Sequence, residues 1–412
     1  MKKVKMMKKY ATLIATVGIN ANSKQDVVIQ APVEAYKFVR YLVMALYANK
    51  ARHVEVEYVD SSITKQQLMN DSISKLSKVS PWVIEKEKYR VENNCSKITL
   101  VGDDPSVFKN VNSNKLQARQ KAMIENLTPI KKDYHTNRLA WCIAAVATPN
   151  WAKRIFPELS PTQGMIKLWD YIYQACRIDE DSDPEENWEK HIKEMDKHAE
   201  ILNQYQFDKL HYTNLKGTDL YVGLVKNHIW ESARGVQGYN GMYFVPNIPT
   251  EEVFTMPDRN RVDGVVYSSK PLSHNGVLIE DFKIEFKDGR VTSYSAKENI
   301  EQLKSIIEYD EGSHHLGEAA LVSYNSPISL QNVIYQETLF DENASCHLAF
   351  GQSYNETIKD GLNLNEEELI SKGANQSNMH VDFMIGTSDL NIDGIKQDGT
   401  MVPIFRNGNF VF

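Results

Sequence analysis

The spacing of apolar residues along the chain changes near residue 205. Before that point the pattern predicts a strand at 27–30, a helix at 33–49 that opens at Pro32, and a second strand at 53–59. This order of elements is typical of a βαβ unit, whose two strands pair in parallel. The same alternation continues in three more predicted helices and one strand, at 64–77, 114–125, 160–176 and 97–101. The first part of the chain therefore predicts a layered α/β domain.

The N-terminus is open to two interpretations. Five lysines lie within the first nine residues, and an apolar run follows at 10–19. A secretory signal peptide also begins with a basic and then an apolar region. Because the run is short and β-branched and is followed by an extended segment at 26–31, we expect a folded first strand at 10–19.

One other run, at 139–148, is strongly apolar. It is about half as long as a membrane-spanning helix requires. We expect it to form a buried helical turn, and we expect no membrane partner.

From residue 206 onward, apolar and polar residues alternate with period 2. Pairs such as Asp288-Gly289 interrupt the alternation and predict hairpins at 210–224, 279–294 and 390–412. Helices are expected at 296–309 and 365–372. We therefore predict two domains: an α/β domain with βαβ units at 1–205, and a mixed α+β domain rich in antiparallel strands at 206–412.

The acidic stretch at 179–186 has a structural explanation. Asp183 is expected to cap a helix that begins at Pro184, because acidic residues are favoured in the first turn of a helix. His191 and His198 lie seven positions apart on that helix without a third ligand at helical spacing. They therefore do not predict a metal site.

Charge and cysteine content narrow the choice of partners and compartment. The net charge of −7 supplies no basic surface for a polyanion, so nucleic acid is not expected as a partner. The four cysteines are far apart and include no C-x-x-C pair, which favours a reducing, cytoplasmic compartment. The turn at 30–33 lacks the G-x-G-x-x-G pattern of a dinucleotide-binding fold.

Histidines and carboxylates gather beside glycines in four segments of the second domain, at 247–254, 314–318, 339–351 and 378–383. The sharpest local signal is His380-Val-Asp382. In a strand, residues two apart project from the same face about 6 to 7 Å apart, so both can serve one metal centre. A solvated strand edge is the alternative.

Other catalytic arrangements fit less well. Cys346 and His347 are neighbours, and neighbours on a strand point to opposite faces, so they cannot form a nucleophile–base pair there. The sequence contains neither G-x-S-x-G nor H-E-x-x-H. With these arrangements excluded, the many carboxylates and few histidines of the four segments suit a pair of divalent metal ions.

Together the four segments resemble a known family. The sequences N-I-P-T-E-E-V-F-T, L-G-E-A-A-L-V, T-L-F-D-E-N-A-S-C-H-L-A-F-G-Q-S-Y and H-V-D-F-M-I-G occur in this order. They resemble the metal-dependent aminopeptidases of the aminopeptidase T, aminopeptidase S and PepS family, peptidase family M29. With the V-G-I-N segment near the N-terminus, the resemblance covers nearly the whole chain.

The resemblance implies a two-metal centre with one set of ligands: Glu252, Glu318, His347, His380 and Asp382. It also implies that Tyr354 reaches the site, where its hydroxyl can stabilise the oxyanion formed when a metal-activated water attacks. A tyrosine of the core is the alternative for Tyr354.

Neighbouring residues receive weaker assignments. Glu251 is a candidate general base or ligand of the substrate amine, and mere solvation is its alternative. We expect Asp341 and Glu342 to hold their loop and to orient His347. We expect His314 and His315 to lie at the surface or outside the ligand set.

The expected function is that of a cytoplasmic, homodimeric metalloaminopeptidase. It would remove N-terminal residues from short peptides with a free N-terminus, using two divalent ions (Zn²⁺, Co²⁺ or Mn²⁺). Two alternatives remain open: a two-metal amidase acting on a non-peptide amide, and a non-catalytic protein that binds metal or peptide.

Overall fold

The computed structural model describes residues 2–22 and 24–412. The chain forms two compact units. Unit 1 contains the residues up to Glu189 together with Arg234–Pro249, and unit 2 contains Lys190–Ala233 and Thr250–Phe412. Helix α9 (Pro184–Tyr205) contributes residues to both. The functional division into 1–205 and 206–412 stays a prediction.

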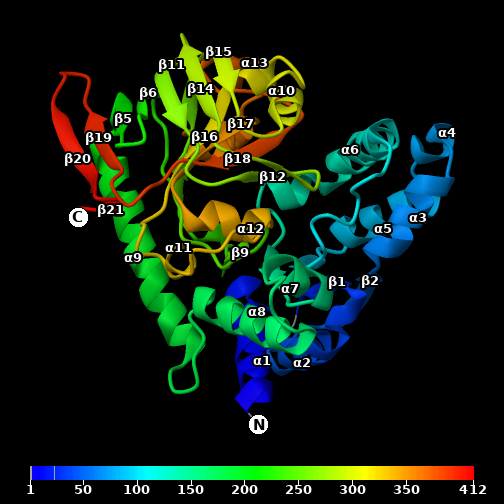
Figure 1. Ribbon diagram of the computed structural model, residues 1–412. Helices are drawn as coiled ribbons and strands as arrows, with labels where there is room; N and C mark the ends of the chain where they lie inside the picture. Colours follow the sequence, from blue (N-terminus) through cyan, green and yellow to red (C-terminus); the bar gives the residue numbers. More distant parts are fainter. Residues whose placement is uncertain (1, 23) are drawn as a thin grey trace. The chain divides into compact units, whose positions relative to one another are not determined.

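Unit 1 is built on a parallel sheet whose strands and helices alternate along the chain (Figure 1). The strand order is β2-β1-β3-β4-β9, and each neighbouring pair is parallel. The strands are β1 (Asp26–Pro32), β2 (His53–Val59), β3 (Ser96–Val101), β4 (Trp141–Ala145) and β9 (Asn247–Ile248). The predicted α/β fold with βαβ units is therefore confirmed.

The helices of unit 1 are α1 (Lys2–Leu13), α2 (Tyr36–Ala48), α3 (Ser61–Asn70), α4 (Ile73–Leu76), α5 (Pro81–Glu92), α6 (Ser113–His135), α7 (Pro149–Ile155) and α8 (Pro161–Ala175). Helix α8 begins with a capping box in which Ser160 and Gln163 exchange hydrogen bonds. The predicted cap of α9 is also confirmed, since Asp183 Oδ1 accepts the Glu185 N–H at 2.9 Å.

Two predicted elements of unit 1 are wrong. The run at 10–19 continues α1 and then forms a π-helical turn, Ile14–Gly18, because Met6, Tyr10 and Leu13 are buried at helical rather than alternating spacing. The run at 139–148 contains strand β4 instead of a helical turn. A strand inside a parallel sheet is covered on both faces, so it can read as a continuous apolar run.

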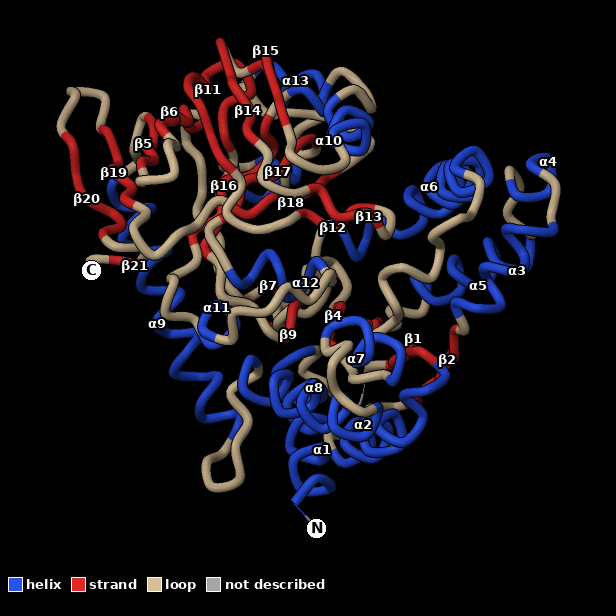
Figure 2. Tube along the Cα trace, in the orientation of Figure 1, coloured by secondary structure: helices blue, strands red, loops and turns tan. Residues whose placement is uncertain are grey.

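Unit 2 contains two larger antiparallel sheets, whose strands are drawn in red in Figure 2. The larger has eight strands in the order β15-β14-β11-β6-β5-β19-β20-β21. Its strands are β5 (Lys209–Thr213), β6 (Asp219–Leu224), β11 (Pro257–Tyr267), β14 (Lys283–Lys287), β15 (Arg290–Ser295), β19 (Asn391–Ile395), β20 (Met401–Arg406) and β21 (Asn409–Phe410). The three predicted hairpins are confirmed.

The smaller sheet of unit 2 has four strands in the order β10-β16-β17-β18. They are β10 (Val253–Thr255), β16 (Leu316–Leu321), β17 (His347–Gly351) and β18 (His380–Met384). The helices of unit 2 after α9 are α10 (Ile300–Ile307), α11 (Pro327–Leu330), α12 (Thr338–Asp341) and α13 (Glu366–Ser371). Short 3₁₀ turns lie at η3 (Gly312–His314), η4 (Glu342–Ala344), η5 (Asn355–Thr357) and η6 (Gly361–Asn363).

The remaining short strands form two separate ribbons. They are β7 (Gly235–Val236) with β8 (Tyr243–Phe244) in unit 1, and β12 (Leu272–His274) with β13 (Val277–Ile279) in unit 2.

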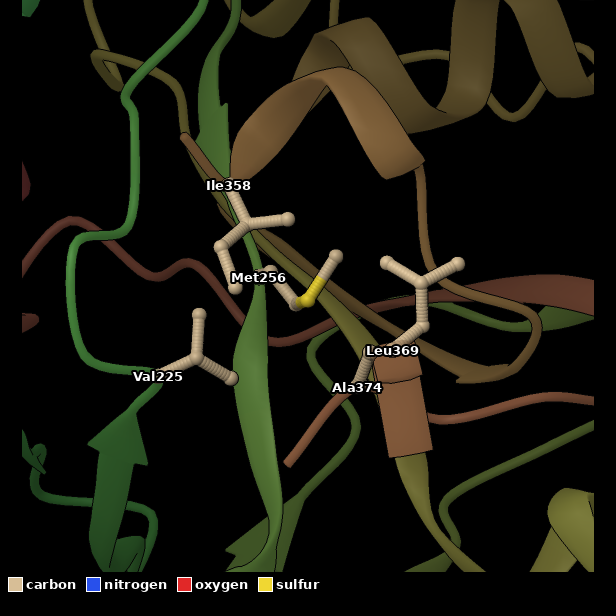
Figure 3. Close-up of a cluster of buried hydrophobic side chains, with 5 residues drawn as sticks. All are labelled: Val225, Met256, Ile358, Leu369 and Ala374. Carbon is tan, nitrogen blue, oxygen red and sulfur yellow. The ribbon is translucent and has the colours of Figure 1, made fainter. Parts of the chain in front are cut away.

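Figure 3 shows a compact cluster of buried apolar side chains in unit 2. It joins five buried side chains: Val225, Met256, Ile358, Leu369 and Ala374. Met256 follows β10, Ile358 follows η5, and Leu369 belongs to α13. Burying these side chains together therefore anchors the end of β10 and the segment after Tyr354.

Two further observations concern the chain as a whole. All four cysteines are buried thiols. Within residues 2–22 and 24–412, we find no helix of sufficient length and apolarity to cross a membrane.

Candidate metal centre

The four-stranded sheet of unit 2 directs four of the five predicted ligands to one place, and Glu252 comes from the segment just before β10. Across β16, β17 and β18, Glu318 is in register with Ala349, and Ala349 with Asp382, so the three side chains share a face. His347 and His380 lie two residues from Ala349 and Asp382 on their strands, and therefore project from the same face. Because Ala349 ends at a methyl group, space remains between the acidic side chains.

Short distances join these ligands into two groups. His347 Nε2 lies 3.1 Å from Glu252 Oε2, and His380 Nε2 lies 3.0 Å from Glu318 Oε2 and 3.1 Å from Asp382 Oδ1. The potential ligand atoms of Glu252, Glu318 and His347 lie within 4.8 Å of one another, as do those of Glu318, His380 and Asp382. Glu318 belongs to both groups.

Each imidazole is held at its other nitrogen by a main-chain carbonyl. The Nδ1–H of His347 donates to the Ser345 carbonyl at 3.1 Å, and that of His380 to the Gln352 carbonyl at 2.7 Å. A carbonyl oxygen only accepts, so Nδ1 carries the proton in both rings. Both Nε2 atoms are thereby turned toward the carboxylates, as in metal-ligating histidines.

The electrostatics of the site favour bound cations. Burial opposes charging His347, but the hydrogen bond with Glu252 and the surrounding carboxylates outweigh it and raise the pKa of His347 to about 10. Burial likewise opposes charging His380, yet Asp382 and Glu318 raise its pKa well above the ordinary value. Protons are therefore held strongly at the two Nε2 atoms, where a divalent ion would replace them.

Glu342, from η4, is a further carboxylate of this cluster. Burial and repulsion from Asp382 and Glu252 raise its pKa well above the ordinary value. Burial also raises the pKa of Glu318, although His380 opposes that shift. Mixed carboxylate and imidazole donors suit divalent transition metals, so the residues of this chain fit the metal expected from the sequence.

The expected orienting role of Asp341 and Glu342 toward His347 is wrong. The Ser345 carbonyl accepts the hydrogen bond that fixes the His347 ring. Asp341 instead accepts the Tyr335 N–H at 2.7 Å and so holds its own loop, as expected. Asp341 ends α12, and its carboxylate accepts main-chain N–H groups of residues 335–337 at the start of that segment.

Tyr354 lies beside the ligands and outside the core. The residue is 41% exposed, and its ring contacts the rings of His380 and Phe254 at centroid distances of 4.9 and 5.8 Å. Desolvation and the nearby carboxylates of Glu318 and Asp382 raise the pKa of Tyr354 well above its ordinary value. The phenol therefore stays protonated and can donate a hydrogen bond.

Glu251 belongs to neither metal-binding group among the described residues. Its side chain is buried rather than solvated, and Oε2 lies 3.8 Å from Nε2 of His191 in α9. Its N–H donates to Asn343 Oδ1 at 2.7 Å. Its catalytic role stays a prediction.

His315 is also buried, contrary to a surface position. Its Nδ1–H lies 2.8 Å from the Arg259 carbonyl and 3.0 Å from that of Gly289, so the ring supports the neighbouring hairpin. Neither His314 nor His315 belongs to a metal-binding group among the described residues.

Sequence reasoning named Glu342 beside the site, but it missed His191 and Asn343 as partners of the 250–251 segment. The only local signal for His191 was its place on the buried face of a predicted helix.

Comparisons with known proteins agree over nearly the full length. A family model described as thermophilic metalloprotease (M29) matches residues 3–410. Aminopeptidase PepS of Streptococcus thermophilus is 40% identical over 406 residues, and aminopeptidase AmpS of Bacillus subtilis (strain 168) is 39% identical over 403, with 98% of both chains covered in each case. The structure of wild-type AmpT from Thermus thermophilus has a TM-score of 0.92 at 34% identity, and all of both chains is covered.

Proposed function

Because the chain belongs to the thermophilic metalloprotease (M29) family, we propose that it is a metal-dependent aminopeptidase that removes N-terminal residues from short peptides. The observation that carries this proposal is the pair of three-residue groups that share Glu318. The aminopeptidase names of its relatives support the reaction type.

We further propose that the site holds two divalent ions, Zn²⁺, Co²⁺ or Mn²⁺, through Glu252, Glu318, His347, His380 and Asp382. The charge supports two ions. Four carboxylates, with Glu342 included, offset two doubly charged cations when both imidazoles are neutral. Glu318, which both groups contain, is the proposed bridge.

Divalent ions at this position would polarise the scissile carbonyl and make a water acidic enough to attack near neutral pH. The chain's own groups complete the reaction. The phenol of Tyr354 donates its O–H to the substrate carbonyl oxygen as negative charge develops there. Glu251 is the proposed ligand of the substrate ammonium or the general base that takes the proton from water.

Cellular location and assembly belong to the same proposal. Four buried thiols are compatible with the reducing cytoplasm, where we place the protein. We propose a homodimer, which sedimentation velocity would test, and short peptides with a free N-terminus as substrates, without nucleic acid or membrane partners.

The decisive experiment uses one ten-residue peptide with a free N-terminus and its N-acetylated form. Mass spectrometry should show the free peptide shortened one residue at a time and the acetylated peptide intact. Internal fragments, or equal cleavage of both peptides, would contradict the aminopeptidase proposal.

Chelation separates the proposal from its two alternatives. Excess chelator should abolish hydrolysis, and Zn²⁺, Co²⁺ or Mn²⁺ should restore it. Hydrolysis of simple amides without hydrolysis of peptides would favour an amidase. Metal binding without any hydrolysis would favour a binding protein.

A further inference from the structure

Glu252 occupies a position that the sheet itself does not fix. The ladder between β10 and β16 begins at Val253, so Glu252 precedes the first paired residue. Its carboxylate nevertheless lies 3.1 Å from His347. Something other than the ladder must set the direction of the main chain just before β10.

The peptide group between Thr250 and Glu251 is held at both of its polar ends. The Thr250 carbonyl lies 2.8 Å from His191 Nε2, and the Glu251 N–H donates to Asn343 Oδ1 at 2.7 Å. The carbonyl can only accept, so His191 carries a proton on Nε2. Both partners are buried, His191 at 7% and Asn343 at 0% exposure.

The amide of Asn343 is itself fixed. Its Nδ2 donates to the Leu339 carbonyl at 2.9 Å and to Glu342 Oε1 at 3.3 Å. These two acceptors leave Oδ1 as the atom that faces Glu251. Asn343 therefore links the main chain before Glu252 to the carboxylate of Glu342.

We propose that His191 and Asn343 are positioning residues that clamp the peptide group between Thr250 and Glu251 and thereby aim the carboxylate of Glu252 into the metal centre. A peptide group is planar, so holding its oxygen and its nitrogen fixes the whole plane. Only the rotations at Glu251 and Glu252 separate this plane from the first ladder residue, Val253. The inference rests on the proposed metal role of Glu252.

The test compares side chains that keep or lose the donor at position 191. Glutamine places its Nε2 near that of histidine, whereas phenylalanine keeps the ring without a donor and asparagine is too short to reach. Zn²⁺ affinity is measured on chelator-stripped, folded protein by competition with a chromogenic chelator. His191→Phe and His191→Asn should bind Zn²⁺ about 10- to 100-fold more weakly than wild type, which is the usual effect of removing a residue that orients a metal ligand. His191→Gln should recover most of the affinity.

A second variant and a control complete the design. Asn343→Leu has a similar shape and should weaken Zn²⁺ binding similarly. The double variant His191→Phe/Asn343→Leu should lose less Zn²⁺ affinity than the product of the two single fold-losses, because both side chains hold the same peptide group. His198→Phe is the matched control, because this histidine lies on the same helix and its Nε2 also contacts a main-chain oxygen, that of Phe412, at 3.1 Å. It should bind Zn²⁺ like wild type.

Wild-type Zn²⁺ affinity in folded His191→Phe, or in His191→Asn if the first does not fold, would overturn the clamp. Equal affinity of the asparagine and glutamine variants would do the same. Glu252→Gln in the same assay tests the underlying site separately: if it binds Zn²⁺ like wild type, the metal role of Glu252 fails instead.

Discussion

At the scale of single residues, Tyr354 offers a clean substitution, because phenylalanine removes the hydroxyl and keeps the ring contacts with Phe254 and His380. Tyr354→Phe should lower kcat by about 10²- to 10³-fold, the usual effect of losing one oxyanion donor. Thermal stability should hardly change. Steady-state kinetics on an aminoacyl p-nitroanilide and a melting curve measure both, and an unchanged kcat would make Tyr354 a structural residue.

Glu318 and Asp382 differ in how many metal-binding groups they serve. Glu318 is part of both groups and Asp382 of one. Glu318→Gln should therefore empty both positions, whereas Asp382→Asn should leave the group of Glu252, Glu318 and His347 able to bind. The metal-to-protein ratio after gel filtration, measured by inductively coupled plasma mass spectrometry, should fall further in the Glu318 variant than in the Asp382 variant. Equal ratios would contradict a shared ligand.

The sequence predicted some of these residue positions on physical grounds. The shared face of His380 and Asp382 follows from the two-residue period of a strand. Glu252 and Glu318 were named only through the resemblance to a family. The contacts of His191 with Thr250 and of Asn343 with Glu251 join residues 59 and 92 positions apart. Such contacts depend on how distant segments pack, which local periodicity does not encode.

At the scale of elements, β17 is a spacer between the two acidic strands. Ala349 is buried and lies in register with both Glu318 and Asp382. Ala349→Leu should fill the space between the carboxylates and abolish metal binding, while overpacking costs about 1 to 3 kcal/mol of stability. Ala349→Ser, which is nearly as small, is the control. Retention of the wild-type metal content in the leucine variant would show that the space is not needed.

Elements were predicted well where the apolar period or a turn motif was unambiguous. The hairpin at Asp288-Gly289 was found because this pair favours a tight turn. Strand β4 and the π-helical turn of Ile14–Gly18 were not found. Both are five-residue runs without an exposed position, so they offer few polar positions from which a period could be read.

At the scale of the whole molecule, bound metal should contribute to stability. A ligand that binds only the folded chain stabilises it by about 4.1 kcal/mol at a concentration 1,000 times its Kd. Chelation should therefore lower the melting temperature of the wild type and leave that of Glu318→Gln unchanged. Calorimetry with and without chelator measures this. The same melting temperature in both conditions, with metal loss verified, would argue against metal binding coupled to the fold.

The overall architecture was predictable because the spacing of apolar residues changes once along the chain. Helical spacing dominates before residue 205 and alternation after it, and these match the parallel sheet of unit 1 and the antiparallel sheets of unit 2. The segment Arg234–Pro249 belongs to unit 1 although it follows residue 205. Its short strand β9 pairs with β4, and such a two-residue strand leaves no periodic signal.

The burial of all four thiols makes the native protein a convenient substrate for single-site labelling. Burial raises the pKa of Cys95 to about 11 and that of Cys346 to about 12, so maleimide reagents, which attack thiolates, should react slowly with them. Leu215 lies between β5 and β6 and is 93% exposed. A cysteine placed there by Leu215→Cys should accept one dye or spin label quickly, which allows fluorescence and resonance studies without first removing the native cysteines.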